Sequence, residues 1–104
     1  MIHKVIVQKR ALLQFQSICN YLAEEFGEQT ADDFEFEVGN CIATLKIFPE
    51  SGHPEDIESK YQWRSKIVGK YNKMYYFVDR NTMVIAAFAD MRMHPDNILK
   101  SILG

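Results

Sequence analysis

The stretch YNKMYYFVDRNTMVIAAFAD, Tyr71–Asp90, decides the fold. It holds two runs rich in aromatic and β-branched residues, a composition that favours β-strands. Both runs are apolar on both faces over much of their length, as central strands of a sheet are. The four residues Asp79–Thr82 between the runs predict a tight hairpin turn. The stretch therefore predicts two central antiparallel strands.

Two further strands are predicted upstream. The segment YQWRSKIVG, residues 61–69, alternates, with Trp63, Ser65 and Ile67 on one face and Arg64, Lys66 and Val68 on the other. The opening segment IHKVIVQ, residues 2–8, also alternates and reads as a short strand. This first strand is expected at an edge of the sheet or paired with a later strand.

Two helices are predicted between the first strand and the rest. The first runs from Arg10 to Gly27, and the second begins with Thr30 as the N-cap and stops before Pro49. Gly39, inside the second helix, suggests a close helix–helix approach. Apolar residues recur at helical spacing in both, namely Leu12, Phe15, Ile18, Cys19, Leu22 and Phe26, then Ala31, Phe34, Val38, Cys41, Ile42, Leu45 and Ile47 or Phe48.

The order of elements predicts an α+β fold. The short link between the helices favours an antiparallel hairpin, packed on one face of a largely antiparallel sheet. Apolar residues after Pro95 recur at helical spacing, which adds a short last helix. The full order is β-α-α-β-β-β with that helix at the end, and we expect residues 1–104 to form one domain.

Composition excludes several classes of protein. The start is too short and too charged for a signal peptide, and no apolar run is long enough for a membrane span, so we expect a cytoplasmic protein without membrane partners. Cys19 and Cys41 lie too far apart for a typical zinc motif, and His3 and His53 lack metal-ligand spacing. There is no phosphate loop or dinucleotide fingerprint. We expect no metal and no cofactor.

Charge is distributed unevenly along the chain. Between Glu24 and Glu58 the only basic residue is Lys46, whereas Lys60–Arg80 contains one acid, Asp79. A basic face would suit an acidic partner or nucleic acid. The alternative is that the two regions neutralise each other across the fold. The sequence leaves both readings open.

Two groups of residues are candidates for chemistry. Asp90, Arg92 and His94 alternate, so they share a face if the strand continues that far. An acid, a base and a histidine on one face could do acid–base work on a phosphodiester. The other reading is that Asp90 and Pro95 are structural residues at the strand end, with His94 exposed.

The second group interleaves basic and aromatic residues, which could hold phosphates and stack bases, or form a solvated edge. Its members are Lys60, Arg64, Lys66, Lys70 and Lys73 with Tyr61, Trp63 and Tyr71.

The chain resembles the RelE/ParE superfamily of toxins from bacterial type II toxin–antitoxin systems, which include plasmid stabilisation modules. The resemblance covers nearly the whole chain. It lies in VQKRALLQFQSICNYLAEEF, in ATLKIFPESGHPE, in WRSKIVGKYNKMYYFVD and in VIAAFADMRMHP, taken in this order. It implies a helical hairpin on a curved sheet, and an antitoxin that wraps and silences the toxin. The assembly is then either a toxin–antitoxin hetero-oligomer or a homodimer of the toxin.

The two branches of the superfamily differ in target. RelE-like members cleave messenger RNA on the ribosome, with lysines, arginines and a tyrosine near the C-terminus, whereas ParE-like members poison DNA gyrase. In this chain Asn72 stands where the nuclease branch often has arginine, and no tyrosine follows Arg92. The resemblance therefore favours the ParE-like branch and a target-binding set of Arg64, Lys66, Lys70 and Arg92.

Two alternatives stay open. If the chain is an endoribonuclease, the candidate catalytic residues are Arg92, His94 and Lys73. The chain could also be a non-toxic member that only binds an antitoxin-like partner. Whether it is an enzyme is left undecided by the sequence.

Overall fold

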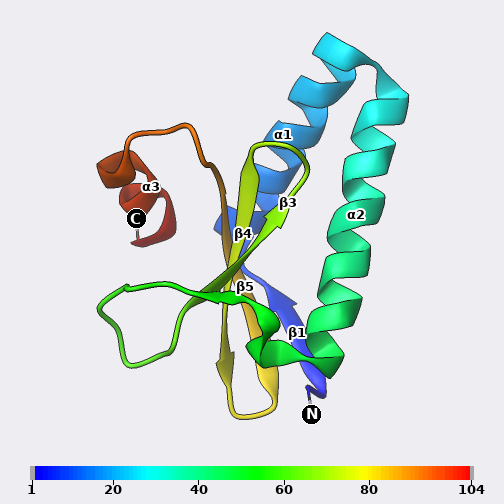
Figure 1. Ribbon diagram of the computed structural model, residues 1–104. Helices are drawn as coiled ribbons and strands as arrows, with labels where there is room; N and C mark the ends of the chain where they lie inside the picture. The colour runs from blue at the N-terminus through cyan, green and yellow to red at the C-terminus, as the bar shows by residue number, and fades with distance from the viewer. Residues whose placement is uncertain (1, 104) are drawn as a thin grey trace.

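The computed structural model describes residues 2–103 and contains a helical hairpin packed on a five-stranded sheet (Figure 1). A 3₁₀ turn, Pro49–Ser51, follows the hairpin. The elements in chain order are β1 (Lys4–Val7), α1 (Lys9–Phe26), α2 (Glu28–Ile47), β2 (His53–Pro54), β3 (Arg64–Val68), β4 (Asn72–Asp79), β5 (Thr82–Asp90) and α3 (Pro95–Leu103).

The sheet has the strand order β1-β5-β4-β3-β2. The hairpin β4–β5 lies at its centre, as Tyr71–Asp90 predicts, with Arg80 at φ 60° in the two-residue turn. The edge strand β1 pairs in parallel with β5, with Lys4 opposite Thr82. All other neighbours are antiparallel. The predicted α+β class is confirmed, and so is the expectation that β1 lies at an edge beside a later strand.

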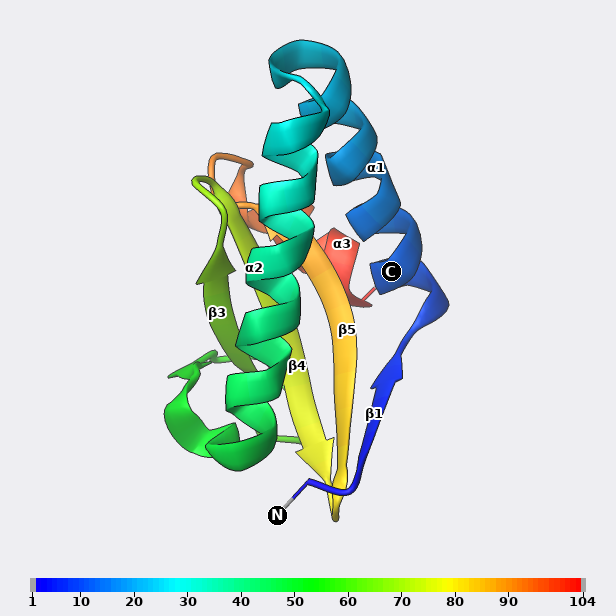
Figure 2. The same ribbon diagram turned by 90° about the vertical axis from the view of Figure 1, so that its right-hand side faces the viewer.

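The hairpin α1–α2 covers one face of the sheet, and the main core lies between these layers (Figure 2). Leu45, Met74 and Tyr76 are fully buried there, and Phe34 is nearly so. A second cluster lies on the opposite face, where Trp63, Tyr75, Phe77 and others pack with Ile102 of α3. Both faces of β4 and β5 are therefore covered, which explains their continuous apolar sequence.

A bulge in β5 sets the direction of its last side chains. Tyr75 pairs with Ala87 but Tyr76 pairs with Ile85, so Ala86 is an extra residue in the strand. After the bulge, Phe88 lies in the core beneath the helical hairpin, as Ile85 does. Because side chains alternate along a strand, Asp90 lies on that same side.

Several local predictions are wrong. Thr30 does not cap α2, because the helix begins at Glu28 and the Thr30 hydroxyl donates to the carbonyl of Phe26 in the preceding turn. Gly39 has open space where a Cβ would lie, so no close helix approach explains it. Leu12, Phe26, Ile47 and Phe48 are exposed although the helical patterns place them in the core.

The two cysteines are free, partly buried thiols that pack against the main core. Burial raises the pKa of both, and nearby Glu35 and Asp32 add to the rise at Cys19. Within residues 2–103 no cluster of histidine, cysteine and acidic side chains could hold a metal ion. None of the helices described is long and apolar enough to cross a membrane.

Candidate functional site

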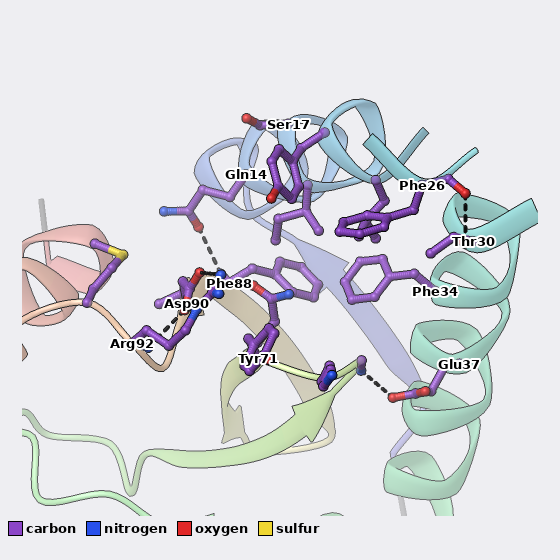
Figure 3. Close-up of a pocket in the computed structure, with 18 of the residues that line it drawn as sticks. Gln14, Ser17, Phe26, Thr30, Phe34, Glu37, Tyr71, Phe88, Asp90 and Arg92 are labelled. Carbon is purple, nitrogen blue, oxygen red and sulfur yellow. Dashed lines mark hydrogen bonds and ion pairs between the residues drawn. The ribbon is translucent and has the colours of Figure 1, made fainter. Parts of the chain in front are cut away.

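An open groove of about 1310 Å³ lies between the outer half of the helical hairpin and the end of the sheet (Figure 3). The two helices extend past the strand ends here, as Figure 1 shows. Residues of α1 and α2 form one side of the groove. The loop between β3 and β4 and the end of β5 form the other.

The groove has an apolar lining. Its floor is a group of aromatic rings, in which Phe15 packs against Phe34 at 5.8 Å and against Phe88 at 5.6 Å between centroids. Tyr21 and Phe26 of α1 line its outer part, and they are 53% and 63% exposed. Exposed aromatic side chains grouped beside an apolar groove are typical of an interaction surface.

Arg92 lies at the rim of this groove and is held by Asp90. The guanidinium donates to both carboxylate oxygens, from Nε at 3.0 Å and from Nη2 at 2.7 Å, and the Arg92 amide donates to Oδ1 at 2.8 Å. These hydrogen bonds hold the pKa of Asp90 below its ordinary value and raise that of Arg92. The Arg92 side chain remains 59% exposed.

Tyr71 supports two cations at this rim. The Arg92 guanidinium lies over the Tyr71 ring, 4.0 Å from its centroid, and Lys70 Nζ lies 5.4 Å from the same centroid. A cation over an aromatic face is attracted by the negative charge of the ring face. The rim of the groove therefore carries two oriented positive charges beside one carboxylate.

Several backbone amides at the groove already donate hydrogen bonds within the chain. The amide of Gly69 donates to the Glu37 carboxylate, that of Phe88 donates to Gln14 Oε1 at 2.8 Å, and that of Met91 donates to the Tyr71 carbonyl at 2.7 Å. Figure 3 shows Gln14 reaching from α1 to Phe88 and Glu37 reaching from α2 to the loop.

Of the other predicted target-binding residues, Lys70 lies at the groove, whereas Arg64 and Lys66 lie away from it. Arg64 is four residues from the groove end of β3, about 13 Å along the strand, and its Nη1 donates to the carbonyls of Glu50 and Gly52. Lys66 faces α2, where its charge opposes the rise in pKa that burial gives Cys41.

The structure does not bring the three catalytic candidates together. Lys73 forms an ion pair with Glu55 at 3.2 Å, on the side of the sheet away from the hairpin. His94 precedes α3, and its Nδ1 accepts from the Asp96 amide at 3.2 Å, so the ring caps that helix. Pro95 is the first residue of α3 and does not end β5, which stops at Asp90.

Sequence reasoning missed the aromatic part of the groove. Phe26 fits the core stripe of its helix, and Tyr21 was not assigned to the site. The lengths give no signal, because α1 has 18 residues and α2 has 20, whereas β4 has eight and β5 has nine. Helices of this length span about 27–30 Å and the two central strands about 26–30 Å, so the lengths alone do not show that the helix tip extends past the sheet.

The comparisons with known proteins identify the family. A family model described as "ParE toxin of type II toxin-antitoxin system, parDE" matches residues 5–95. The chain belongs to the ParE toxin family. A solved structure of the "Chromosomal ParDE TA system from P. aeruginosa" matches this ParE toxin with a TM-score of 0.72 at 11% identity, over 88% of this chain and 98% of the other. At that identity the structural likeness shows the fold alone.

A search of curated proteins found no match to this ParE toxin. The family assignment nevertheless confirms the predicted class, a ParE-like toxin of a type II toxin–antitoxin system. Membership also implies a cognate antitoxin as partner.

Proposed function

We propose that this ParE-family toxin acts by binding DNA gyrase and does not cleave RNA. The observation that supports the proposal is the separation of Arg92, His94 and Lys73. RNA cleavage by a ribose hydroxyl requires a base, an acid and a phosphate clamp within reach of the same bond. Here Lys73 lies on the other side of the sheet and His94 caps α3. The ParE-like branch, which the chain resembles most, poisons gyrase.

In this proposal the groove end of the molecule is the working surface. Arg92 and Lys70 present positive charge there, while Tyr21 and Phe26 expose apolar area next to them. The antitoxin occupies the groove and covers Arg92. Neutralisation then results because the antitoxin and the target compete for one surface. Lys66 and Arg64 contribute less, because one faces α2 and the other holds the Glu50–Gly52 turn.

Expression of the toxin without its antitoxin tests the proposal, with messenger integrity and DNA damage measured in the same cells. We expect intact messages and a DNA-damage response with accumulated gyrase–DNA cleavage complexes. Arg92→Ala should weaken both DNA effects, whereas Lys73→Ala and His94→Ala should leave them unchanged.

Cuts in translated messages that disappear in Arg92→Ala would establish the nuclease alternative instead. Harmless expression, with neither cuts nor DNA damage, would favour a family member that only binds its partner. Either result overturns the gyrase proposal.

A further inference from the structure

We propose that the groove accepts an amphipathic helix of the antitoxin that carries basic side chains along one flank and acidic side chains along the other. This inference rests on the proposed function, in which the antitoxin occupies the groove. It adds the chemistry by which this toxin selects its partner. The argument depends on the size of the groove, its bonded backbone and the opposite charges of its two sides.

The size of the groove fits a protein segment. Its volume of about 1310 Å³ exceeds the roughly 300–1,000 Å³ of small-molecule sites. Its lining comes from α1, α2, the β3–β4 loop, the end of β5 with the segment after it, and Ser101 of α3, so an occupant contacts several elements at once. An α-helix with side chains is about 10–12 Å across and presents one apolar face, as Ile18, Leu22 and Phe34 require.

The bonded amides at the end of β5 and at Gly69 disfavour an added strand in this place. Strand addition needs free amides and carbonyls on the receiving edge. In the groove, the amides of Gly69, Phe88 and Met91 already donate within the chain, and that of Arg92 donates to Asp90. An occupant must therefore bind through side chains, as a helix in a groove does.

The two sides of the groove carry opposite charges. The α2 side has Asp33 and Glu37, which are four residues apart and therefore on one face of the helix. The strand side has Lys70 and Arg92 around Tyr71, where Asp90 leaves a net positive charge. A helix lying between them is complementary when its basic flank faces α2 and its acidic flank faces Tyr71.

Intramolecular contacts hold these charged groups in place before a partner arrives. Gln29 Nε2 donates to Asp33 Oδ1 at 2.8 Å, the amide of Gly69 donates to Glu37, and Asp90 binds the Arg92 guanidinium at two atoms. Side chains that are already ordered lose less entropy on binding. The charge pattern therefore determines which helix binds and in which direction it enters.

The test uses four synthetic 20-residue helical peptides that share one leucine and alanine stripe. Each peptide has two flanks beside that stripe. The first peptide has lysines on one flank and glutamates on the other, the second has lysines on both, the third has glutamates on both, and the fourth has glutamines on both. Fluorescence anisotropy measures their binding to the intact toxin chain. We expect the lysine–glutamate peptide to bind about tenfold more tightly than either single-charge peptide, because like charges repel across the interface.

Charge-reversal variants check the assignment of each side. Lys70→Glu should shift the preference to the all-lysine peptide, and Asp33→Lys with Glu37→Lys should shift it to the all-glutamate peptide. The matched control is Lys60→Glu. Lys60 Nζ also lies over an adjacent tyrosine, 5.1 Å from the Tyr61 centroid, but it does not line the groove. Lys60→Glu should therefore leave the preference for the lysine–glutamate peptide unchanged.

A second pair of variants checks the location. Phe26→Asp should weaken binding of every peptide, because Phe26 lines the groove. Phe36→Asp is the control, since Phe36 is 71% exposed on the same helical hairpin outside the groove. Equal binding of the four peptides, no binding of any, or equal effects of the paired variants would each overturn the inference. None of these results depends on gyrase, so this failure is distinct from failure of the proposed function.

Discussion

Two arginines near opposite ends of the sheet differ in what their neighbours leave free. Arg64 donates Nη1 to two backbone carbonyls, those of Glu50 and Gly52, and so joins β3 to the turn after α2. Arg92 is bound by a carboxylate and a tyrosine ring but stays exposed beside the groove. The difference teaches that backbone acceptors decide the role of a basic residue on this sheet. Where carbonyls accept from it, the residue has a structural role; where no carbonyl does, its charge is available to a partner.

The end around Arg64 is closed by a buried tyrosine. The Tyr76 hydroxyl donates to the Pro49 carbonyl at 2.7 Å and accepts from the Gly52 amide at 3.0 Å. Tyr76 is fully buried, and burial raises its pKa. This closed end depends on internal hydrogen bonds, whereas the groove end leaves aromatic side chains and Arg92 exposed.

The largest expected effect is at the closed end. A Cβ at Gly52 would lie 2.2 Å from the Tyr76 hydroxyl and 2.7 Å from its ring. Gly52→Ala should therefore lower the free energy of unfolding by about 3 kcal/mol, because the ring must move and its hydrogen bonds are lost. Urea denaturation measures this loss.

The matched control for that variant is Gly39→Ala, at a helix position with open space around it. It should raise the free energy of unfolding by about 0.5–1 kcal/mol, as alanine does in a helix interior. If both glycine variants change stability equally, the closed end is not rigid.

A smaller effect separates the two arginines. Arg64→Ala should lower the free energy of unfolding by about 1–2 kcal/mol, because two charged hydrogen bonds to carbonyls are lost at a partly exposed site. Arg92→Ala should leave the denaturation midpoint near that of the wild type and impair antitoxin binding instead. Denaturation curves and toxin–antitoxin titrations on both variants measure the contrast. A loss of stability in Arg92→Ala together with a loss of antitoxin binding in Arg64→Ala would reverse the comparison.

The pH dependence of the Asp90–Arg92 pair gives a still smaller effect. Because the folded-state pKa of Asp90 is lowered, its contribution to stability is present above its unfolded pKa of about 3.9 and is lost as pH falls through the folded value. Asp90→Asn should thus melt slightly below the wild type at neutral pH, and the two should converge in acid below about pH 4. Thermal melts of both proteins from acid to neutral pH test this expectation. A difference in melting temperature that stays the same at every pH would exclude a contribution from the Asp90 charge.

The smallest effect is expected in the hairpin between the two ends. Cys19 and Cys41 are free thiols. Because burial raises the pKa of both, they should react slowly with iodoacetamide at neutral pH. A reducing agent should leave the melting temperature unchanged, and a shift would reveal a disulfide.

The architecture was predictable because its signals are local and repeated. The aromatic and β-branched apolar runs in Tyr71–Asp90, the turn at Arg80 and the helical spacing in both helices each specify an element without reference to distant residues. The bulge at Ala86 was not predictable, since it depends on register across two strands. It is the bulge that directs Asp90 toward the groove.

The site was only partly predictable, because neighbours determine whether a side chain is available. Arg64, Lys66 and Lys73 look equivalent in sequence. Arg64 donates to carbonyls, Lys66 faces α2 and Lys73 pairs with Glu55. Arg92 and Lys70 both lie at the groove, over the ring of Tyr71. Their spacing in the sequence does not show that the two cations share one ring.

The parallel pairing of β1 with β5 has a consequence for how the molecule is made. Lys4 lies opposite Thr82, so β1 has no partner in the sheet until almost 80 further residues have been synthesised. Pairings this distant in sequence form slowly. The residues of the groove rim, Asp90 and Arg92, are translated later still. A growing chain therefore completes the edge of the sheet and the rim of the groove together, late in the synthesis of this domain.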